Sequence, residues 1–245
     1  MDIRNSVVLV TGASSGIGAA TARAAAAAGA RVVLAARREE RIRALAEELP
    51  DARAVACDVT DAQQLASAVR TAVDVYGRLD VLVNNAGQGL HIPLEAVDPA
   101  DFRAVLDLNV VAPLAAMQAV IPIMRSQGAG SIVNVSSGTT LVVRPGAGAY
   151  AASKAALNML SSVARLELAS AGIAVSTVYP FITATEFHRS LRAGGLQATA
   201  SSEEVPPELQ PQPPETVAEV ILELIRSGAE QADLVPTRFG GTYRG

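Results

Sequence analysis

The 245-residue sequence has little cysteine, little lysine and no excess of positive charge, and these shortages exclude several classes of protein. Its one cysteine, Cys57, rules out an internal disulfide and favours a reducing compartment. A formal net charge of −4 argues against the basic surface that binds nucleic acid. The first residues show no signal-peptide pattern, and the alanine run at 24–28 is too short to cross a membrane. We therefore expect a cytoplasmic protein that binds neither nucleic acid nor membrane.

Lysine is so scarce that Lys154 is the single one among the 20 lysine and arginine residues. It follows Tyr150 by four residues, so in a helix both side chains would share one face. A free phenol has a pKa of about 10, and an ammonium about 4 Å away would lower it. Tyr150 could then exchange protons near neutral pH, with Ser137 hydrogen-bonding a substrate oxygen beside it. The alternative is that Lys154 is a solvated helix residue.

Short apolar runs and amphipathic segments alternate along the chain, which predicts an α/β domain. We expect one doubly wound Rossmann-type domain over residues 1–245, with a mainly parallel sheet of about seven strands and helices on both faces. The expected strands are 6–10, 31–36, 52–57, 79–83, 131–135, 174–179 and 233–235, and the expected helices end at 28 or span 41–49, 61–76, 98–127, 150–171 and 215–227. No ligand cluster accompanies His91, so we expect no metal site.

A glycine-rich loop, Thr11–Gly18, lies between the first expected strand and the first helix. Glycines there let backbone N–H groups approach a pyrophosphate at the positive end of the helix. A loop in this strand–loop–helix context predicts dinucleotide binding more strongly than a glycine run alone. The alternative is a turn that only packs the helix onto the sheet.

The end of the second strand indicates which coenzyme is used. A carboxylate there would bind the adenosine ribose of NAD, but the sequence has Ala36 followed by Arg37 and Arg38. Two guanidinium groups suit a 2′-phosphate, which favours NADP(H) over NAD(H). The alternative is that both arginines pair with the glutamates that follow them. After the third strand, Asp58 could accept from the adenine amino group or cap the next helix.

Two further stretches complete the expected cleft. Asn84–Gly87 follows the fourth strand, where paired amides can tie the loop to its neighbour and Gly87 leaves room for a cofactor. The proline- and glycine-rich segment 181–214 is long for a loop inside a compact domain, which predicts a substrate lid. Its inner face would be apolar through Phe181, Phe187, Leu191 and Leu196. The alternative is a disordered excursion.

Over roughly residues 5–235 these motifs resemble the short-chain dehydrogenase/reductase family. Thr11–Gly18 is similar to its Thr-Gly-x-x-x-Gly-x-Gly loop and Asn84–Gly87 to its Asn-Asn-Ala-Gly motif. Asn109, Ser137, Tyr150 and Lys154 match its four catalytic positions, with thirteen residues from Ser137 to Tyr150. One departure is Phe181, where the family usually has glycine after Pro180.

The resemblance implies a role for each matched residue. Tyr150 would be the general acid/base, Ser137 would stabilise the substrate oxygen, and Lys154 would bind the nicotinamide ribose and lower the pKa of Tyr150. Asn109 would hold a water that links Lys154 to solvent. The implied cofactor-binding residues are Gly12, Ser14, Ser15, Gly16, Ile17, Gly18, Arg37, Arg38, Asp58, Val59, Asn85, Ala86, Gly87, Tyr150, Lys154, Pro180, Thr183 and Thr185.

The function that follows is hydride transfer between NADP(H) and a small, apolar carbonyl or alcohol substrate. Two alternatives remain open, a non-catalytic NADP-binding sensor and another reaction on the same scaffold. By the same resemblance we expect a homodimer or homotetramer formed through helices 98–127 and 150–171. The apolar residues Leu157, Leu160, Val163 and Leu168 on the second helix favour this, unless the sheet covers all of them.

Overall fold

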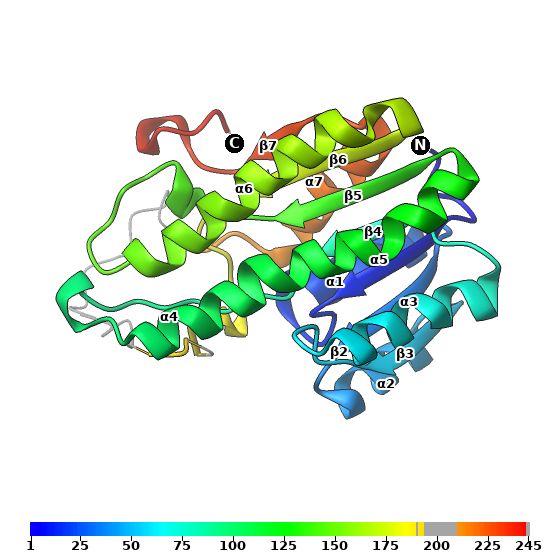
Figure 1. Cartoon of the computed structure of the whole chain (residues 1–245), viewed down its shortest axis with the longest axis horizontal. Coiled ribbons are helices and arrows are strands. Elements are labelled where there is room, and N and C mark those ends of the chain that lie inside the picture. Colours follow the sequence, from blue (N-terminus) through cyan, green and yellow to red (C-terminus); the bar gives the residue numbers. More distant parts are fainter. Residues whose placement is uncertain (190, 194–209, 244–245) are drawn as a thin grey trace.

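The computed structural model describes residues 1–189, 191–193 and 210–243, and a seven-stranded sheet forms its centre (Figure 1). The strand order is β3-β2-β1-β4-β5-β6-β7, and every pairing is parallel. The strands are β1 (Val7–Thr11), β2 (Arg31–Ala36), β3 (Ala52–Ala56), β4 (Val81–Asn84), β5 (Gly130–Val135), β6 (Ile173–Tyr179) and β7 (Gln231–Asp233). The predicted doubly wound α/β fold is confirmed.

Helices cover both faces of this sheet, because its central strands are apolar on both sides. On one face pack α1 (Gly16–Ala27), α2 (Glu39–Glu48) and α7 (Pro214–Ser227). On the other face pack α3 (Ala62–Tyr76), α5 (Ala112–Gln127) and α6 (Gly148–Leu168). Side chains alternate along β1, so Val8 and Val10 join the first core while Val7 and Leu9 join the second.

The helical stretch predicted over 98–127 is present as Pro99–Gln127, but its middle contains a π turn that was not predicted. Helix α4 (Pro99–Leu106) passes into a π-helical turn, Asp107–Val111, before α5 begins. A π turn inserts one extra residue into an α-helix. The residues around this turn are nearly all apolar, so the spacing of apolar residues does not reveal the insertion. Pro113 lies in the first turn of α5, directly after the π turn, where its missing N–H is tolerated, and Pro122 lies within the helix. The π turn places Asn109, which is fully buried.

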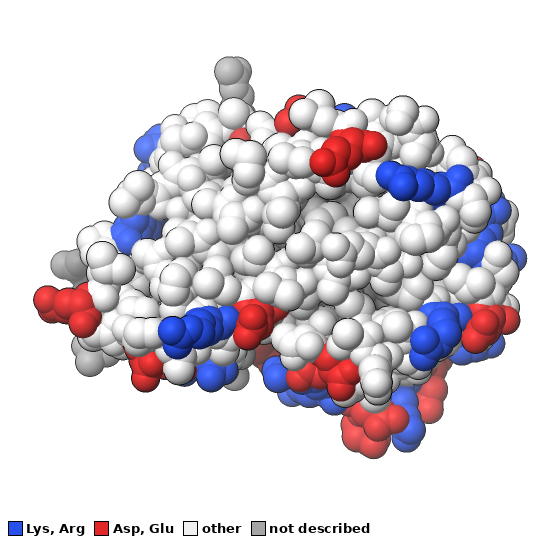
Figure 2. Space-filling model, viewed as in Figure 1, with Lys and Arg blue, Asp and Glu red and all other residues white. Residues whose placement is uncertain are grey.

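A largely uncharged surface lies over α5 and α6 (Figure 2). It includes Val111, Met159, Val163 and Leu166, whose exposed fractions range from 43% to 81%. By contrast Leu157 and Leu168 of α6 are buried against the sheet, which therefore covers part of the apolar surface that the sequence suggested. By length and composition alone the continuous helical stretch Pro99–Gln127 could cross a membrane, because an 18-residue window of it has a mean hydropathy of 1.8. In this structure its second half packs on β4 and β5.

The sheet reverses its winding between β1 and β4, which are neighbours in space. Parallel strands all end at one edge, so the loops after β1, β2, β4, β5 and β6 gather there. This edge is where open α/β sheets bind ligands, and it carries the motifs singled out in the sequence.

Candidate active site

A cleft of about 630 Å³ runs along the carboxyl edge of the sheet. All but two of the predicted site residues line it. The exceptions are Gly18, which packs α1 against the neighbouring loop, and Asn109, which is buried behind the wall. The cleft is also lined by residues that sequence reasoning did not assign to the site, among them Leu108, Val142, Arg144 and Glu186.

The glycine loop fits a pyrophosphate. Gly12 and Gly16 have φ angles of +67° and +54°, a region that side chains disfavour. A Cβ at Gly18 would lie 2.5 Å from the carbonyl oxygen of Gly12, so the loop could not close over the helix with any other residue there. Helix α1 has no side-chain cap at Ser15 and no acidic residue in its first turn. Its first N–H groups are therefore left to a ligand at the positive end of the helix.

The paired amides after β4 tie the sheet edge together in the expected way. Asn84 donates to the side chain of Asn134 on β5 at 2.8 Å. Asn85 donates to the carbonyl oxygens of Thr11 and Gly12 at 2.9 and 3.2 Å. These bonds hold the loop after β4 against the glycine loop across the point where the sheet reverses.

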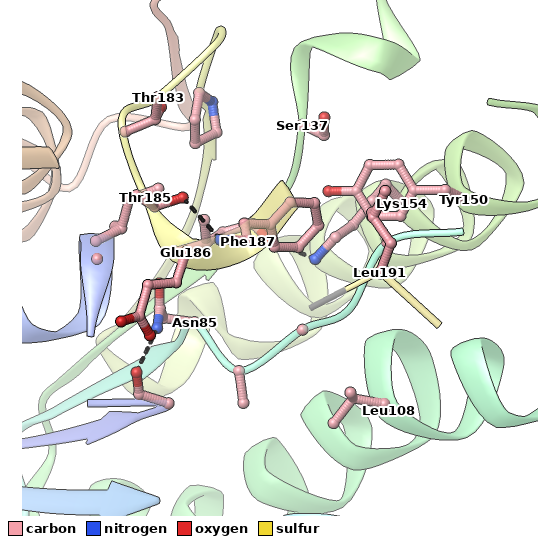
Figure 3. Close-up of a pocket in the computed structure, with 18 of the residues that line it drawn as sticks. Asn85, Leu108, Ser137, Tyr150, Lys154, Thr183, Thr185, Glu186, Phe187 and Leu191 are labelled. Atoms are coloured by element: carbon pink, nitrogen blue, oxygen red, sulfur yellow. Dashed lines mark hydrogen bonds between the residues drawn. The ribbon is translucent and has the colours of Figure 1, made fainter. Parts of the chain in front are cut away.

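The predicted catalytic residues Ser137, Tyr150 and Lys154 meet at one end of the cleft (Figure 3). Tyr150 and Lys154 lie one turn apart on α6, as their spacing predicted. Ser137 follows β5 and caps a short 3₁₀ helix, Gly138–Thr140. Its Oγ accepts from the N–H and the hydroxyl of Thr139 at 3.2 and 3.0 Å, which leaves its own proton to donate toward the cleft.

The lowering of the pKa of Tyr150 that we expected from Lys154 is not found. Burial raises the pKa of Tyr150 to about 12, and the neighbouring Ser137 hydroxyl only partly opposes this. The Lys154 ammonium instead donates to the carbonyl oxygen of Val135 at 2.9 Å, and burial lowers its own pKa to about 8. The prediction failed because the spacing of Tyr150 and Lys154 does not show how deeply the phenol is buried, and burial is the main cause of its raised pKa.

Asn109 is buried behind these residues and links the loop after β4 to α6. Its Oδ1 accepts from the N–H of Gln88, and its Nδ2 donates to the carbonyl oxygen of Gln88 and to the hydroxyl of Ser153. A Cβ at Gly87 would come within 3.2 Å of Asn109 Oδ1 and 3.4 Å of Lys154 Nζ. The missing side chain at Gly87 therefore leaves room for these two groups as well as for a ligand.

At the other end of the cleft, Arg38 turns toward the glycine loop. Its guanidinium donates to the hydroxyls of Ser14 and Ser15 at 3.0 and 2.5 Å. It does not pair with the glutamates that follow it, because its carboxylate partner is Glu186 of the distant segment after β6. The carboxylate of Asp58 accepts hydrogen bonds from the N–H and the hydroxyl of Thr60. Burial alone would raise the pKa of Asp58, but these bonds outweigh it and the pKa is lowered.

The described part of the expected lid folds into the cleft. The ring of Phe187 lies 5.7 Å from the ring of Tyr150, between centroids, and a Cβ at Gly89 would touch both Phe187 and Leu191. Phe181 stacks on Phe239 at 5.4 Å, so the residue that replaces glycine is held by the C-terminal segment. Leu196 and positions 194–209 of the expected lid lie outside the described residues.

Sequence reasoning missed Arg41, Glu186 and the π turn around Asn109. No local pattern marks Glu186, because its partners lie 148 and 145 residues away. Among the described residues there is no group of three or more His, Cys, Asp and Glu side chains that could hold a metal ion.

Comparison with known proteins identifies the family to which this site belongs. A family model described as short chain dehydrogenase matches residues 6–195. The protein is a short-chain dehydrogenase/reductase. Sulfoacetaldehyde reductase 2 of Chromohalobacter salexigens is 38% identical to this dehydrogenase/reductase over 220 residues, which is 88% of this chain and 86% of the relative.

Solved structures agree with this membership. A short-chain dehydrogenase from Streptomyces avermitilis is 35% identical, with a TM-score of 0.80 over 94% of this chain and 87% of the other. A 3-ketoacyl-(acyl-carrier-protein) reductase from Brucella melitensis, complexed with NADH, is 28% identical, with a TM-score of 0.85 over 95% of this chain and 97% of the other. This short-chain dehydrogenase/reductase is therefore an oxidoreductase that uses a nicotinamide cofactor.

Proposed function

We propose that this oxidoreductase reduces a carbonyl compound with NADPH and oxidises the corresponding alcohol in reverse. The observation that carries the proposal is the meeting of Ser137, Tyr150 and Lys154 at one end of a cleft whose other end is a glycine loop. The bound cofactor would supply or accept the hydride. The protein would supply the proton, the orientation of the substrate and a dry site.

Each of the three side chains has a part in proton transfer. Tyr150 would give its phenolic proton to the substrate oxygen as that oxygen gains negative charge. Ser137 would donate its proton to the same oxygen, because its acceptor capacity is already used by Thr139. Lys154 would bind the cofactor ribose and resupply the proton, and a pKa of about 8 lets it exchange protons near neutral pH.

The proposed preference for NADP(H) is supported by the end of β2. No carboxylate stands at Ala36, and Arg38 already bonds two hydroxyls of the glycine loop. An apolar substrate is supported by the lining of the catalytic end, which includes Leu90, Val142 and Phe187.

The test is a spectrophotometric screen of aldehydes and ketones with NADPH and, in parallel, with NADH. We expect turnover of apolar ketones with a clear preference for NADPH. Equal use of both cofactors would reject the preference, and no turnover with any carbonyl despite cofactor binding would favour a binding protein. As part of the same proposal, the segment 181–214 would act as a lid that closes over the bound substrate.

We also propose that the protein forms a homodimer or homotetramer through α4, α5 and α6, with the uncharged surface over α5 and α6 at the centre of the interface (Figure 2). Met159 and Leu166 are exposed there at 67% and 81%, and exposed apolar patches of this kind mark interaction sites. Sedimentation velocity at micromolar concentration tests this, and a monomer would contradict it.

A further inference from the structure

Glu186 occupies a cluster of cation and hydroxyl donors at the adenosine end of the cleft. Its Oε2 lies 2.7 Å from Nη1 of Arg38 and 2.7 Å from Nη1 of Arg41. The same Arg38 guanidinium bonds the hydroxyls of Ser14 and Ser15. These side chains are about half exposed, so a dissolved ligand can reach all of them.

The cluster lies where a phosphate on the adenosine ribose would be recognised. Strands β1 and β2 are neighbours in register, with Thr11 opposite Ala35, so the glycine loop and the residues after β2 leave the same edge together. Two guanidinium groups and two hydroxyls form a donor set that suits a phosphate monoester better than one carboxylate. A carboxylate held there imitates part of that phosphate.

We propose that Glu186 occupies the subsite for the 2′-phosphate and competes with it, so that this residue sets the affinity for phosphorylated over unphosphorylated cofactor. The inference rests on the NADP(H) preference proposed above. The two arginines lower the pKa of Glu186 to about 2, so its carboxylate stays ionised and competes throughout the working pH range.

Displacement of Glu186 has a consequence at the other end of the cleft. Thr185, Glu186 and Phe187 are consecutive, and a Cβ at Gly16 would lie 2.9 Å from the side chain of Thr185, so this segment rests on the glycine loop. In Figure 3 Phe187 reaches toward Tyr150 while Glu186 points away from it. A phosphate that expels Glu186 therefore loosens the turn that holds Phe187 against Tyr150.

The experiment measures binding of 2′,5′-ADP and 5′-AMP, which differ only in the 2′-phosphate, to three full-length proteins by calorimetry. They are the wild type, Glu186→Gln, and the matched control Glu48→Gln, which removes an exposed carboxylate 2.7 Å from Arg23 and far from the cleft along α2. Exposed ion pairs are weak, so Glu186→Gln should bind 2′,5′-ADP about three- to tenfold more tightly. Its affinity for 5′-AMP should change less than about twofold, and Glu48→Gln should match the wild type with both ligands.

The two proposals fail in different ways. If the wild type prefers 2′,5′-ADP but Glu186→Gln binds it no more tightly, the competition is refuted while the cofactor preference stands. If neither protein prefers 2′,5′-ADP to 5′-AMP, the phosphate subsite itself is refuted, and with it both proposals. Hydrogen exchange gives a second readout, since 2′,5′-ADP but not 5′-AMP should speed exchange at residues 185–187; equal exchange with both ligands would overturn the coupling.

Discussion

Replacing Lys154 by methionine should stabilise the fold at neutral pH while it abolishes activity. Lys154 is only 4% exposed, and burial lowers its pKa from 10.5 to about 8. At about 1.4 kcal/mol for each factor of ten in an acid constant, holding that charge inside the folded protein costs about 3 kcal/mol. Methionine has a similar length and no charge, but it leaves the carbonyl oxygen of Val135 without its donor, at about 1 kcal/mol. The expected net gain in the free energy of unfolding is about 2 kcal/mol at pH 7.

The pH dependence of stability tests independently whether the buried charge of Lys154 destabilises the fold. The folded pKa lies below the unfolded one, so between pH 8 and 10.5 the unfolded chain holds a proton that the folded protein has released. Wild-type stability should therefore rise through this window relative to Lys154→Met. The advantage of the variant should shrink by about 2–3 kcal/mol between pH 7 and 10.

Urea unfolding followed by far-ultraviolet circular dichroism, at one fixed protein concentration, measures this difference. Ionisation of Tyr150, whose pKa burial raises, is common to both proteins and cancels in the comparison. Lys154→Arg is the control, because its guanidinium does not titrate in this range and should show no such rise. Parallel stability curves for the wild type and Lys154→Met between pH 7 and 10 would refute the claim that burial of the Lys154 ammonium destabilises the fold.

Three further outcomes follow from the geometry. Ala36→Asp should shift the ratio of kcat/KM for NADPH over NADH toward NADH by at least about tenfold, and an unchanged ratio would count against the assigned end of β2. Gly18→Ala should lower the stability by about 1–3 kcal/mol because its Cβ meets the backbone of the glycine loop, whereas Gly148→Ala, which meets only a leucine methyl at 3.9 Å, should not; equal melting temperatures would contradict the close packing. Hydrogen exchange over residues 181–193 should slow when a substrate analogue is added to the NADPH complex, and unchanged protection relative to that complex would argue against a lid.

The sequence allowed the fold to be predicted closely, because apolar runs and caps are local signals. β2 has its expected bounds, and the other strands differ from expectation by at most two residues at either end. The interruption at Asp107–Val111 was not predictable, since nearly every residue from Leu108 to Met124 is apolar and a one-residue shift in helical phase leaves no visible break there.

The site was predicted less completely, for physical reasons that differ by residue. The sequence predicted that Ser137, Tyr150 and Lys154 lie at one edge of the sheet, because all strands of a parallel sheet end at the same edge. The direction of the Tyr150 pKa depends on burial and on the acceptor that Lys154 chooses, which exist only in the folded protein. The partnership of Arg38 with Glu186 joins segments far apart in the chain and leaves no local trace.

The central claim is that Tyr150 transfers the proton to the substrate oxygen. Tyr150→Phe removes one hydroxyl and keeps the ring that packs against Phe187. With the best ketone from the screen, single-turnover oxidation of NADPH should slow by at least about a thousandfold, while the dissociation constant for NADPH stays within about threefold of the wild type. A variant that retains wild-type single-turnover rates, or that loses rate only in proportion to lost NADPH binding, would contradict the account.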